Sequence, residues 1–525
     1  MNNNILVSRR RLLAGAAASS ALATGLARAV SEWDIFPVVE TSNGRLRGLV
    51  SGGINVFKGV NYGADTSGAN RFMPPAPVVK WAGVKDATAY GNYAPQLPSS
   101  RVRAYADLIM YDLQPGGMGE DCLVLNLWTP GLAKTAKRPV MLHLHGGGYY
   151  GGSGNSPQFD GEMLARSGNA VVISINHRLG SFGFLDLAEA GGARYGQSGA
   201  AGMLDIVAAL GWVRDNIEAF GGDPSRVLVY GQSGGGAKTS VLMSMPSAKG
   251  LFHRAGVMSG SVLRVATPER SSRAAAIYLK LLGLDKDSVA QLHKLPWHQL
   301  LAAQVTMEGM DRAKGEAPTA FTPVLDGVAI PRHPFDPDAP AVSSDVPMMI
   351  STTLDERAYR QINFDLDAPG LLAYAERQAP GDGDKLVRMY REEDPKATPF
   401  VLQARIDSDM TFRKTAHVQA PRAGLHLSVE DCQPGLQRPL WRAARRGHRP
   451  QHERHPQWPQ WPHSREPVAG RPVVQRLGQL CRHRQSQQPE DAAVACLHPA
   501  RAHDHGLRRR QQPHGRASRP AQGIP

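Results

Sequence analysis

The sequence predicts an α/β fold with a mainly parallel central sheet flanked by helices. Three short apolar runs, at residues 139–144, 170–175 and 226–230, are typical of buried strands. Between the last two, apolar residues recur at helical spacing from residue 201 to 217. Strand, helix and strand therefore alternate along the chain, and this order favours parallel strand pairing.

Glycine-rich loops follow two of the predicted strands. Three glycines occupy residues 146–148, and the third strand ends at Gly231. Ligands of such sheets bind beyond the carboxyl ends of the strands, so these loops mark the expected site. From about residue 267 to 322 the pattern becomes helical and irregular, which predicts a helical insertion beside the sheet.

The positive charge of the chain is concentrated in its last fifth. Residues 421–525 hold 18 Arg, no Lys and 7 acidic residues, which leaves +3 of the total +14 for the rest. A nearly neutral body gives no reason to expect a nucleic-acid partner. Three of the four cysteines also lie in the tail, so the body has only Cys122 and cannot form an internal disulfide.

The N-terminus predicts an export signal. Residues 8–13 read Ser-Arg-Arg-Arg-Leu-Leu, an Ala-rich run follows, and residues 27–29 read Ala-Arg-Ala, a small-residue cleavage site. We expect a twin-arginine signal over residues 1–29 and a periplasmic or secreted mature protein; a general secretory signal is the alternative. No later segment is apolar for about 18 residues, so no membrane span is predicted.

Ser233 is the candidate nucleophile. Residues 231–235 fit the pattern G-x-S-x-G after a predicted strand, and residues 237–245 can form a helix. A sharp strand-to-helix turn lifts the serine hydroxyl clear of the backbone and needs glycines two residues to either side. The helix N-terminus then stabilises developing negative charge. Without this context, the same pattern in a glycine-rich chain is more often an ordinary loop.

A second glycine loop supplies candidate donors for an oxyanion. Residues 145–149 read His-Gly-Gly-Gly-Tyr, and a backbone without side chains can approach a substrate closely. The amides of Gly147, Gly148 and Gly234 are the candidates. A phosphate cradle is the weaker alternative because no Lys-Ser/Thr follows, and a flexible glycine turn stays open.

With these motifs in view, the body resembles the type-B carboxylesterases, the family that includes cholinesterases. The similar blocks run in order from about residue 38 to 415 and comprise residues 57–62, 71–75, 120–126, 176–178, 216–224, 231–235 and 249–255. The resemblance implies an α/β-hydrolase fold with helical insertions and a serine hydrolase of carboxylic esters. It implies no metal and no organic cofactor.

The resemblance also assigns roles. It makes Ser233 the nucleophile, Gly147, Gly148 and Gly234 the oxyanion donors, and Glu356 the acid that orients the base. The family's Asp-Glu-Gly block is Asp355-Glu356-Arg357 here, so a glycine is replaced and Asp355 is an adjacent competitor. Without the resemblance, either carboxylate would be taken for a solvated surface group.

Cys122 differs from the family in its partner. The family often pairs this cysteine with one that precedes Pro-Gln, and here that position is Ala94. We therefore expect Cys122 to be a buried free thiol.

The family's histidine, which lies in a Gly-Ala-x-His-Gly block, is missing from the sequence. A serine hydroxyl needs a base to take its proton. Allowed codons for residues 436–448, read one base later, encode YNGRYGAPHGVD, with the histidine codon straddling Ala444 and Arg445. Residues 477–507 likewise permit a family-like C-terminal sequence, so we expect a one-base frame displacement between about residues 420 and 436.

The expected organisation is a signal at residues 1–29, a truncated hydrolase domain at 30–430 and an out-of-frame basic tail at 431–525. The tail lacks a regular apolar pattern, so we expect it to be disordered; a basic nucleic-acid arm is the alternative. The expected activity is hydrolysis of a small-molecule carboxylic ester, nearly abolished in the written chain. A non-catalytic binding or adhesion-type protein of the same fold is the second hypothesis.

Overall fold

The computed structural model describes residues 35–97, 114–313 and 320–422. The predicted export signal, residues 1–29, and the predicted basic tail, residues 431–525, lie outside the described residues.

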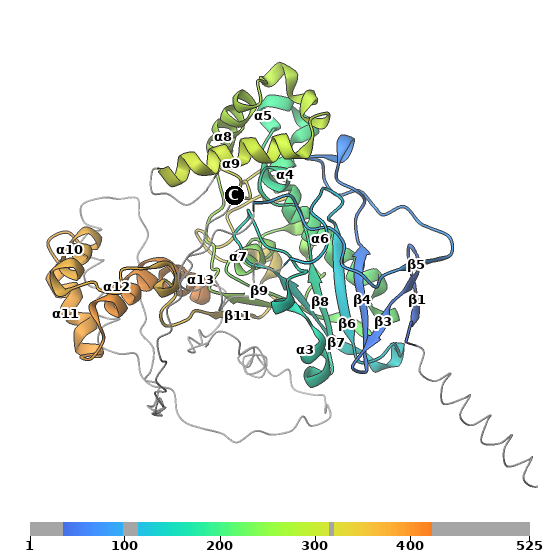
Figure 1. Ribbon diagram of the computed structural model, residues 1–525, viewed down its shortest axis with the longest axis horizontal. Helices are drawn as coiled ribbons and strands as arrows, with labels where there is room; N and C mark the ends of the chain where they lie inside the picture. The colour runs from blue at the N-terminus through green and yellow to red at the C-terminus, as the bar shows by residue number, and fades with distance from the viewer. Residues whose placement is uncertain (1–34, 98–113, 314–319, 423–525) are drawn as a thin grey trace, which may run out of the picture.

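An eight-stranded sheet forms the centre of the described chain (Figure 1), with strand order β11-β10-β9-β7-β8-β6-β4-β3. Its strands are β3 (Leu49–Ser51), β4 (Ile54–Asn61), β6 (Val124–Thr129), β7 (Arg138–Leu144), β8 (Val171–Ile175), β9 (Gly222–Gln232), β10 (Arg254–Met258) and β11 (Met348–Ser351). The predicted strands correspond to β7, β8 and β9, and β9 is longer than expected.

Five neighbouring strands, from β11 to β8, pair in parallel, as the alternation of strand and helix predicts. The other end of the sheet, formed by β6, β4 and β3, is antiparallel. A second sheet of three short strands joins β1 (Val38–Thr41), β2 (Gly44–Arg47) and β5 (Val84–Asp86). The sequence pattern does not predict this second sheet, because strands of three or four residues carry too little periodicity.

Helices flank both faces of the large sheet. The helices of the body are α3 (Glu162–Gly168), α4 (Gly180–Phe184), α5 (Ala188–Gly191), α6 (Ala201–Asn216), α7 (Gly234–Leu242), α8 (Pro268–Leu281) and α9 (Trp297–Ala313). On β8, Val171 and Ile173 pack in the main core with α6 and α7, whereas Val172 packs with Ala165 of α3. Burial on both faces explains why the strands are continuous apolar runs rather than alternating ones.

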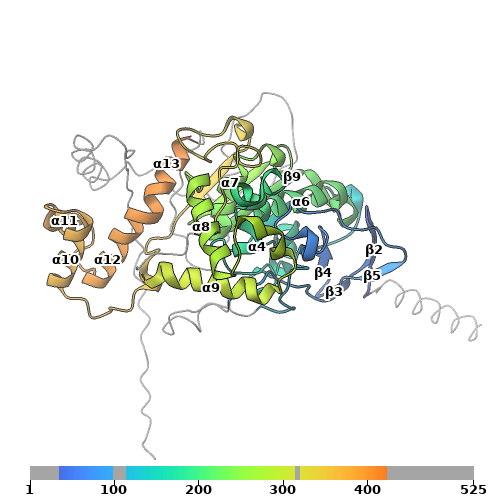
Figure 2. The ribbon, with the colours of Figure 1, turned by 90° about the horizontal axis from the view of Figure 1, so that it is seen from above.

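Two helical regions do not cover the faces of the sheet. Helices α8 and α9 cross the top of the sheet in Figure 1 and form the insertion predicted for residues 267–322. Helices α10 (Ala368–Gln378), α11 (Gly383–Glu393) and α12 (Pro399–Ser408) form an arm that stands apart from the sheet in both views (Figures 1 and 2). The arm has its own apolar core, which includes Leu386 and Leu402, and α13 (Lys414–Arg422) leads from it back to β11.

Two simpler predictions can be compared directly with the described residues. Cys122 is buried and forms no disulfide, as expected. Burial raises the pKa of its thiol well above the usual value. Among the described helices, none has both the length and the apolar character required to cross a membrane.

Candidate active site

Ser233 lies on a strained turn between β9 and α7. Its backbone has φ +56° and ψ −122°, a conformation that non-glycine residues rarely adopt and that often marks a functional site. A Cβ on Gly231 would lie 2.5 Å from the carbonyl oxygen of Leu144, and a Cβ on Gly235 only 2.0 Å from the same oxygen. The glycines of the G-x-S-x-G pattern are therefore required by backbone contact with the end of β7.

Helix α7 begins at Gly234, three residues earlier than the sequence indicated, and ends at Leu242. Three consecutive glycines hid this start because glycine has a low helix propensity. The Ser233 amide donates to the carbonyl oxygen of Met258 (2.8 Å), and its own carbonyl accepts from the Ala237 amide (2.9 Å). Half-buried Ser233 thus sits at the N-terminus of a nine-residue helix, where negative charge is favoured.

The second glycine loop comes directly against this turn. Gly147 and Gly148 both have positive φ, +92° and +64°. A Cβ on Gly234 would lie 2.4 Å from both the amide nitrogen and the carbonyl oxygen of Gly148. The structure therefore brings Gly234, which follows Ser233, into backbone contact with Gly148, which follows Gly147. The role of these three amides as oxyanion donors stays a prediction.

Buried amide side chains hold the continuation of this loop. Gln96 donates from Nε2 to the carbonyl of Gly152 (2.9 Å) and accepts from its amide at Oε1 (2.7 Å). Asn176 Oδ1 accepts from the Gly154 amide (2.7 Å) and from Ser153 Oγ (3.1 Å). The sequence analysis noted Asn176 only as part of a similar block and Gln96 only as the Gln of the Pro-Gln pair after Ala94. It missed this role, which depends on contacts across 22 to 56 residues.

Glu356 is buried in the loop that follows β11, with 6% of its surface exposed. Its Oε1 accepts from the Thr353 amide (2.7 Å) and from the hydroxyl of Ser259. Ser259 follows β10, has φ +51°, and donates its amide to the carbonyl of Ser351 (2.7 Å). Because β10 is the neighbour of β9, the carboxylate is fixed over the same edge of the sheet as Ser233. No pattern in the sequence predicts the contact between Ser259 and Glu356.

Asp355, the competing carboxylate, faces the helical arm instead. Arg405 of α12 donates to its Oδ1 at 3.1 Å. Arg357, which stands where the family has glycine, donates from Nε to Asp407 at 2.7 Å. The structure therefore separates the two carboxylates: Glu356 lies inside, while Asp355 and Arg357 tie the loop to α12.

A third arginine, Arg413, is hydrogen-bonded to the same loop after β11. Arg413 belongs to a π-helical turn, Asp409–Arg413, between α12 and α13, and it is fully buried. Its guanidinium donates to the carbonyls of Thr353 (3.1 Å) and Leu354. The loop that carries Glu356 is thus fixed to the helices by side chains from residues 405 to 413. We call Arg357, Arg405 and Arg413 the arginine clamp.

No histidine of the described residues is hydrogen-bonded to Ser233 or Glu356. His145 and His177 lie beneath the glycine loop, fully buried and stacked with centroids 5.0 Å apart. Their Nδ1 atoms contact the carbonyls of Gly146 and Arg178, both at 2.8 Å. Burial is the main cause that lowers the pKa of each imidazole well below its usual value. The described residues therefore include the candidate nucleophile, the candidate acid and the candidate backbone donors, with no histidine bonded to Ser233 or Glu356.

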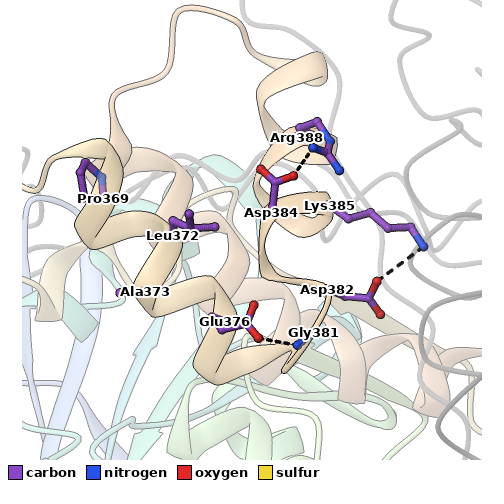
Figure 3. A pocket seen from close by; sticks show the side chains of 9 residues that line it. All are labelled: Pro369, Leu372, Ala373, Glu376, Gly381, Asp382, Asp384, Lys385 and Arg388. Carbon is purple, nitrogen blue, oxygen red and sulfur yellow. Dashed lines mark hydrogen bonds and ion pairs between the residues drawn. The ribbon is translucent and has the colours of Figure 1, made fainter.

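The described residues contain no group of three or more His, Cys, Asp or Glu side chains arranged to hold a metal ion. Two surface hollows of the described chain lie away from Ser233. One, about 530 Å³, is at the N-terminal ends of β9 to β11. The other, about 610 Å³, lies between α10 and α11 of the arm (Figure 3), where Glu376 is already bonded to the Gly381 amide. Neither contains the candidate site residues.

Comparison with known proteins gives consistent relatives. A model described as the carboxylesterase family matches residues 36–399. Para-nitrobenzyl esterase of Bacillus subtilis (strain 168) is 37% identical over 319 residues, 61% of this chain and 63% of that protein. Phenmedipham hydrolase of Pseudarthrobacter oxydans is 37% identical over 335 residues, 62% of each chain. The chain thus spans about six tenths of the length of these curated relatives.

Solved structures show the same similarity. A carboxylesterase of Geobacillus stearothermophilus at pH 6.2 superposes with a TM-score of 0.62 at 34% identity, covering 75% of this chain and 78% of the other. An esterase from Clostridium hathewayi, described as hydrolysing aliphatic aromatic polyesters, superposes with a TM-score of 0.63 at 35% identity over the same shares. These structures support the α/β-hydrolase fold for the body.

Proposed function

Because the chain belongs to the carboxylesterase family, we propose that its body is built to hydrolyse small-molecule carboxylic esters through an acyl-serine intermediate. One observation carries the proposal. Ser233 sits on a strained turn whose next residue, Gly234, is in backbone contact with Gly148. A serine raised beside close-packed, side-chain-free amides is the arrangement that acyl transfer requires.

In the proposed reaction, the Ser233 hydroxyl attacks the ester carbonyl and the alcohol leaves. The amides of Gly147, Gly148 and Gly234 donate to the oxyanion as its charge develops. The N-terminus of α7 adds favourable electrostatics at the same point. Water then hydrolyses the acyl-serine and releases the acid.

The role proposed for Glu356 is to orient a histidine base. Its bonds to Ser259 and to the Thr353 amide hold the carboxylate in a fixed direction for such a partner. We place that base at the displaced-frame codon between Ala444 and Arg445, which lies outside the described residues. Loss of a triad histidine costs on the order of a millionfold in turnover, so the written chain should be nearly inactive.

The test compares two forms of the full chain: the written one, and one whose gene is shifted by one base between codons 420 and 436. We expect the frame-restored chain to hydrolyse p-nitrophenyl acetate on the order of 10⁶-fold faster than the written chain. Ser233→Ala in the restored chain is the control and should return the rate to that of the written chain. A restored, folded chain without hydrolysis would refute the esterase proposal.

A non-catalytic binding protein of the same fold is the second candidate, because the family's histidine block is missing from the written sequence. The close-packed turn at Ser233 and the glycine loop beside it argue against a binding role, because binding alone does not require a strained backbone at a serine. The same comparison separates the esterase from the binding protein. Resequencing that finds no frame displacement in the gene, together with a chain that folds without hydrolysing esters, would support the binding role.

Export through a twin-arginine signal is also proposed, from residues 8–13 and 27–29. Cell fractionation with Arg9 and Arg10 both changed to Lys tests it. The protein should then stay in the cytoplasm, whereas unchanged export would contradict the twin-arginine route.

A further inference from the structure

Lys238 is a buried cation in the helix that carries the nucleophile. It lies on α7, five residues beyond Ser233, and its surface is fully buried. Its Nζ donates to the carbonyl oxygen of His145 at 3.1 Å. No carboxylate of the described residues forms an ion pair with it. Burial of an unpaired ammonium opposes folding, so an apolar side chain of similar length would serve packing better.

The bond from Lys238 joins the two halves of the proposed machinery. Helix α7 and the glycine loop already touch through backbone, Gly235 against Leu144 and Gly234 against Gly148. Lys238 adds one side-chain bond between the same two segments, at the residue where the chain leaves β7 for the loop. It therefore fixes the direction of the His145 carbonyl, and with it the start of the loop that bends at two positive-φ glycines.

The charge of Lys238 is not compensated by the groups around it. The imidazoles of His143 on β7, His145 in the loop and His177 after β8 face it, and its charge helps lower the pKa of all three. They are neutral near pH 7.

Arg178, which follows His177 in the chain, is neutralised by Asp205 in a buried ion pair of 2.6 Å. Below about pH 7, the uncompensated positive charge beneath the glycine loop is therefore that of Lys238, in a low-dielectric interior where charges act strongly.

We propose that Lys238 is a positioning residue for the oxyanion loop, holding the His145 carbonyl and directing positive charge toward the amides that receive the oxyanion. This inference rests on the proposed function, because it assigns Lys238 a part in the same reaction. Lys238 does not touch the substrate; it acts through the loop.

The first experiment measures the stability of the full chain against pH in Lys238→Met. Burial lowers the pKa of Lys238 from its usual 10.5 to about 7. Between these values the unfolded chain binds a proton that the folded chain does not, so stability from this group rises with pH from about 7 to 10. The substitution should raise the melting temperature at pH 7 and flatten this rise. An unchanged slope would overturn the proposal.

The second experiment measures kcat and KM for p-nitrophenyl acetate in the frame-restored chain. Lys238→Met removes both the bond and the charge and should lower kcat by about 100-fold with KM unchanged, because a displaced loop misaligns its donors and the loss of one oxyanion donor costs this much. Lys238→Gln keeps a donor without the charge and should lose about tenfold. If Lys238→Met does not fold, Lys238→Gln alone tests the proposal. Lys249→Met, at an exposed lysine beyond α7, is the matched control.

The pH profile separates positioning from packing. The kcat of the unsubstituted enzyme should decline above about pH 7 as Lys238 loses its proton, and both variants should lack this decline. Normal kcat and an unchanged profile in folded variants would overturn this inference alone. No hydrolysis in the unsubstituted restored chain would overturn the esterase proposal and this inference together.

Discussion

Ser233 and Glu356, the proposed nucleophile and the proposed acid, are held in place by opposite means. Around Ser233, backbone packs on backbone: Gly235 against Leu144, and Gly234 against Gly148. Around Glu356, long side chains reach in from α12 and the turn after it, and the arginine clamp holds the loop to a helical arm that stands apart from the sheet (Figures 1 and 2).

This difference affects how each side responds to change. A close backbone contact has no room for even one methyl group, so the nucleophile side is intolerant of substitution but independent of charge. The clamp consists of several polar bonds of unequal burial, from fully buried Arg413 to partly exposed Arg357. We therefore expect the acid side to lose its geometry gradually and to depend on pH.

The largest expected effect distinguishes the two adjacent carboxylates. In the frame-restored chain, Glu356→Gln should lower kcat for p-nitrophenyl acetate by about 10⁴-fold, as amidation of a triad acid does, because the base loses its orienting charge. Asp355→Asn is the matched control and should cost less than about tenfold, since it breaks only the half-exposed pair with Arg405. Equal losses in both variants would mean that the acid assignment is wrong.

The next effect concerns the close packing at the nucleophile. Gly235→Ala should destabilise the protein by about 3 kcal/mol, because the new Cβ collides with the Leu144 carbonyl. Gly211→Ala is the control: it lies in α6 with no atom within 4 Å of the new Cβ and should stabilise by about 0.5–1 kcal/mol. Urea unfolding measures both. A neutral Gly235→Ala would show that this side is not close-packed.

A smaller effect is the pH dependence of the helices beside the acid. Burial, and secondly Arg413, lower the pKa of His417 on α13 to about 4. The unfolded chain then binds more protons between pH 4 and 6.5, so stability falls as pH drops through this range. His417→Gln should reduce this fall in melting curves, and exposed His298→Gln serves as the surface control. An identical fall in both variants would exclude His417 as its source.

The smallest effect tests the outermost bond of the clamp. Arg357→Gln removes the partly exposed pair with Asp407 and should cost about 0.5 kcal/mol in urea unfolding. In the frame-restored chain it should lower kcat less than Glu356→Gln does. A loss as large as that of Glu356→Gln would show that the clamp, rather than the loop's own bonds, positions the acid.

The agreement between prediction and structure follows the range of the interactions. Strands β7, β8 and β9 and helix α6 were predicted within a few residues, because burial on both faces of a parallel sheet produces runs that are visible locally. The predicted start of α7 was wrong, because the low helix propensity of glycine opposes a helix that the packing around Ser233 requires. The second, three-stranded sheet was not predicted, because its short strands show no recognisable apolar periodicity in the sequence.

The sequence by itself determined the parallel core, the free buried Cys122 and the strand-to-helix turn at Ser233. The turn is predictable because its glycines, which no other residue can replace, lie within five consecutive positions. The resemblance chose Glu356 over Asp355, but only the tertiary structure showed that Glu356 is buried, and that Arg405 and Lys238 make contacts across 50 and 93 residues. The physical reason is that a charged side chain gains its role from the partner it meets, and chain folding alone brings those partners together.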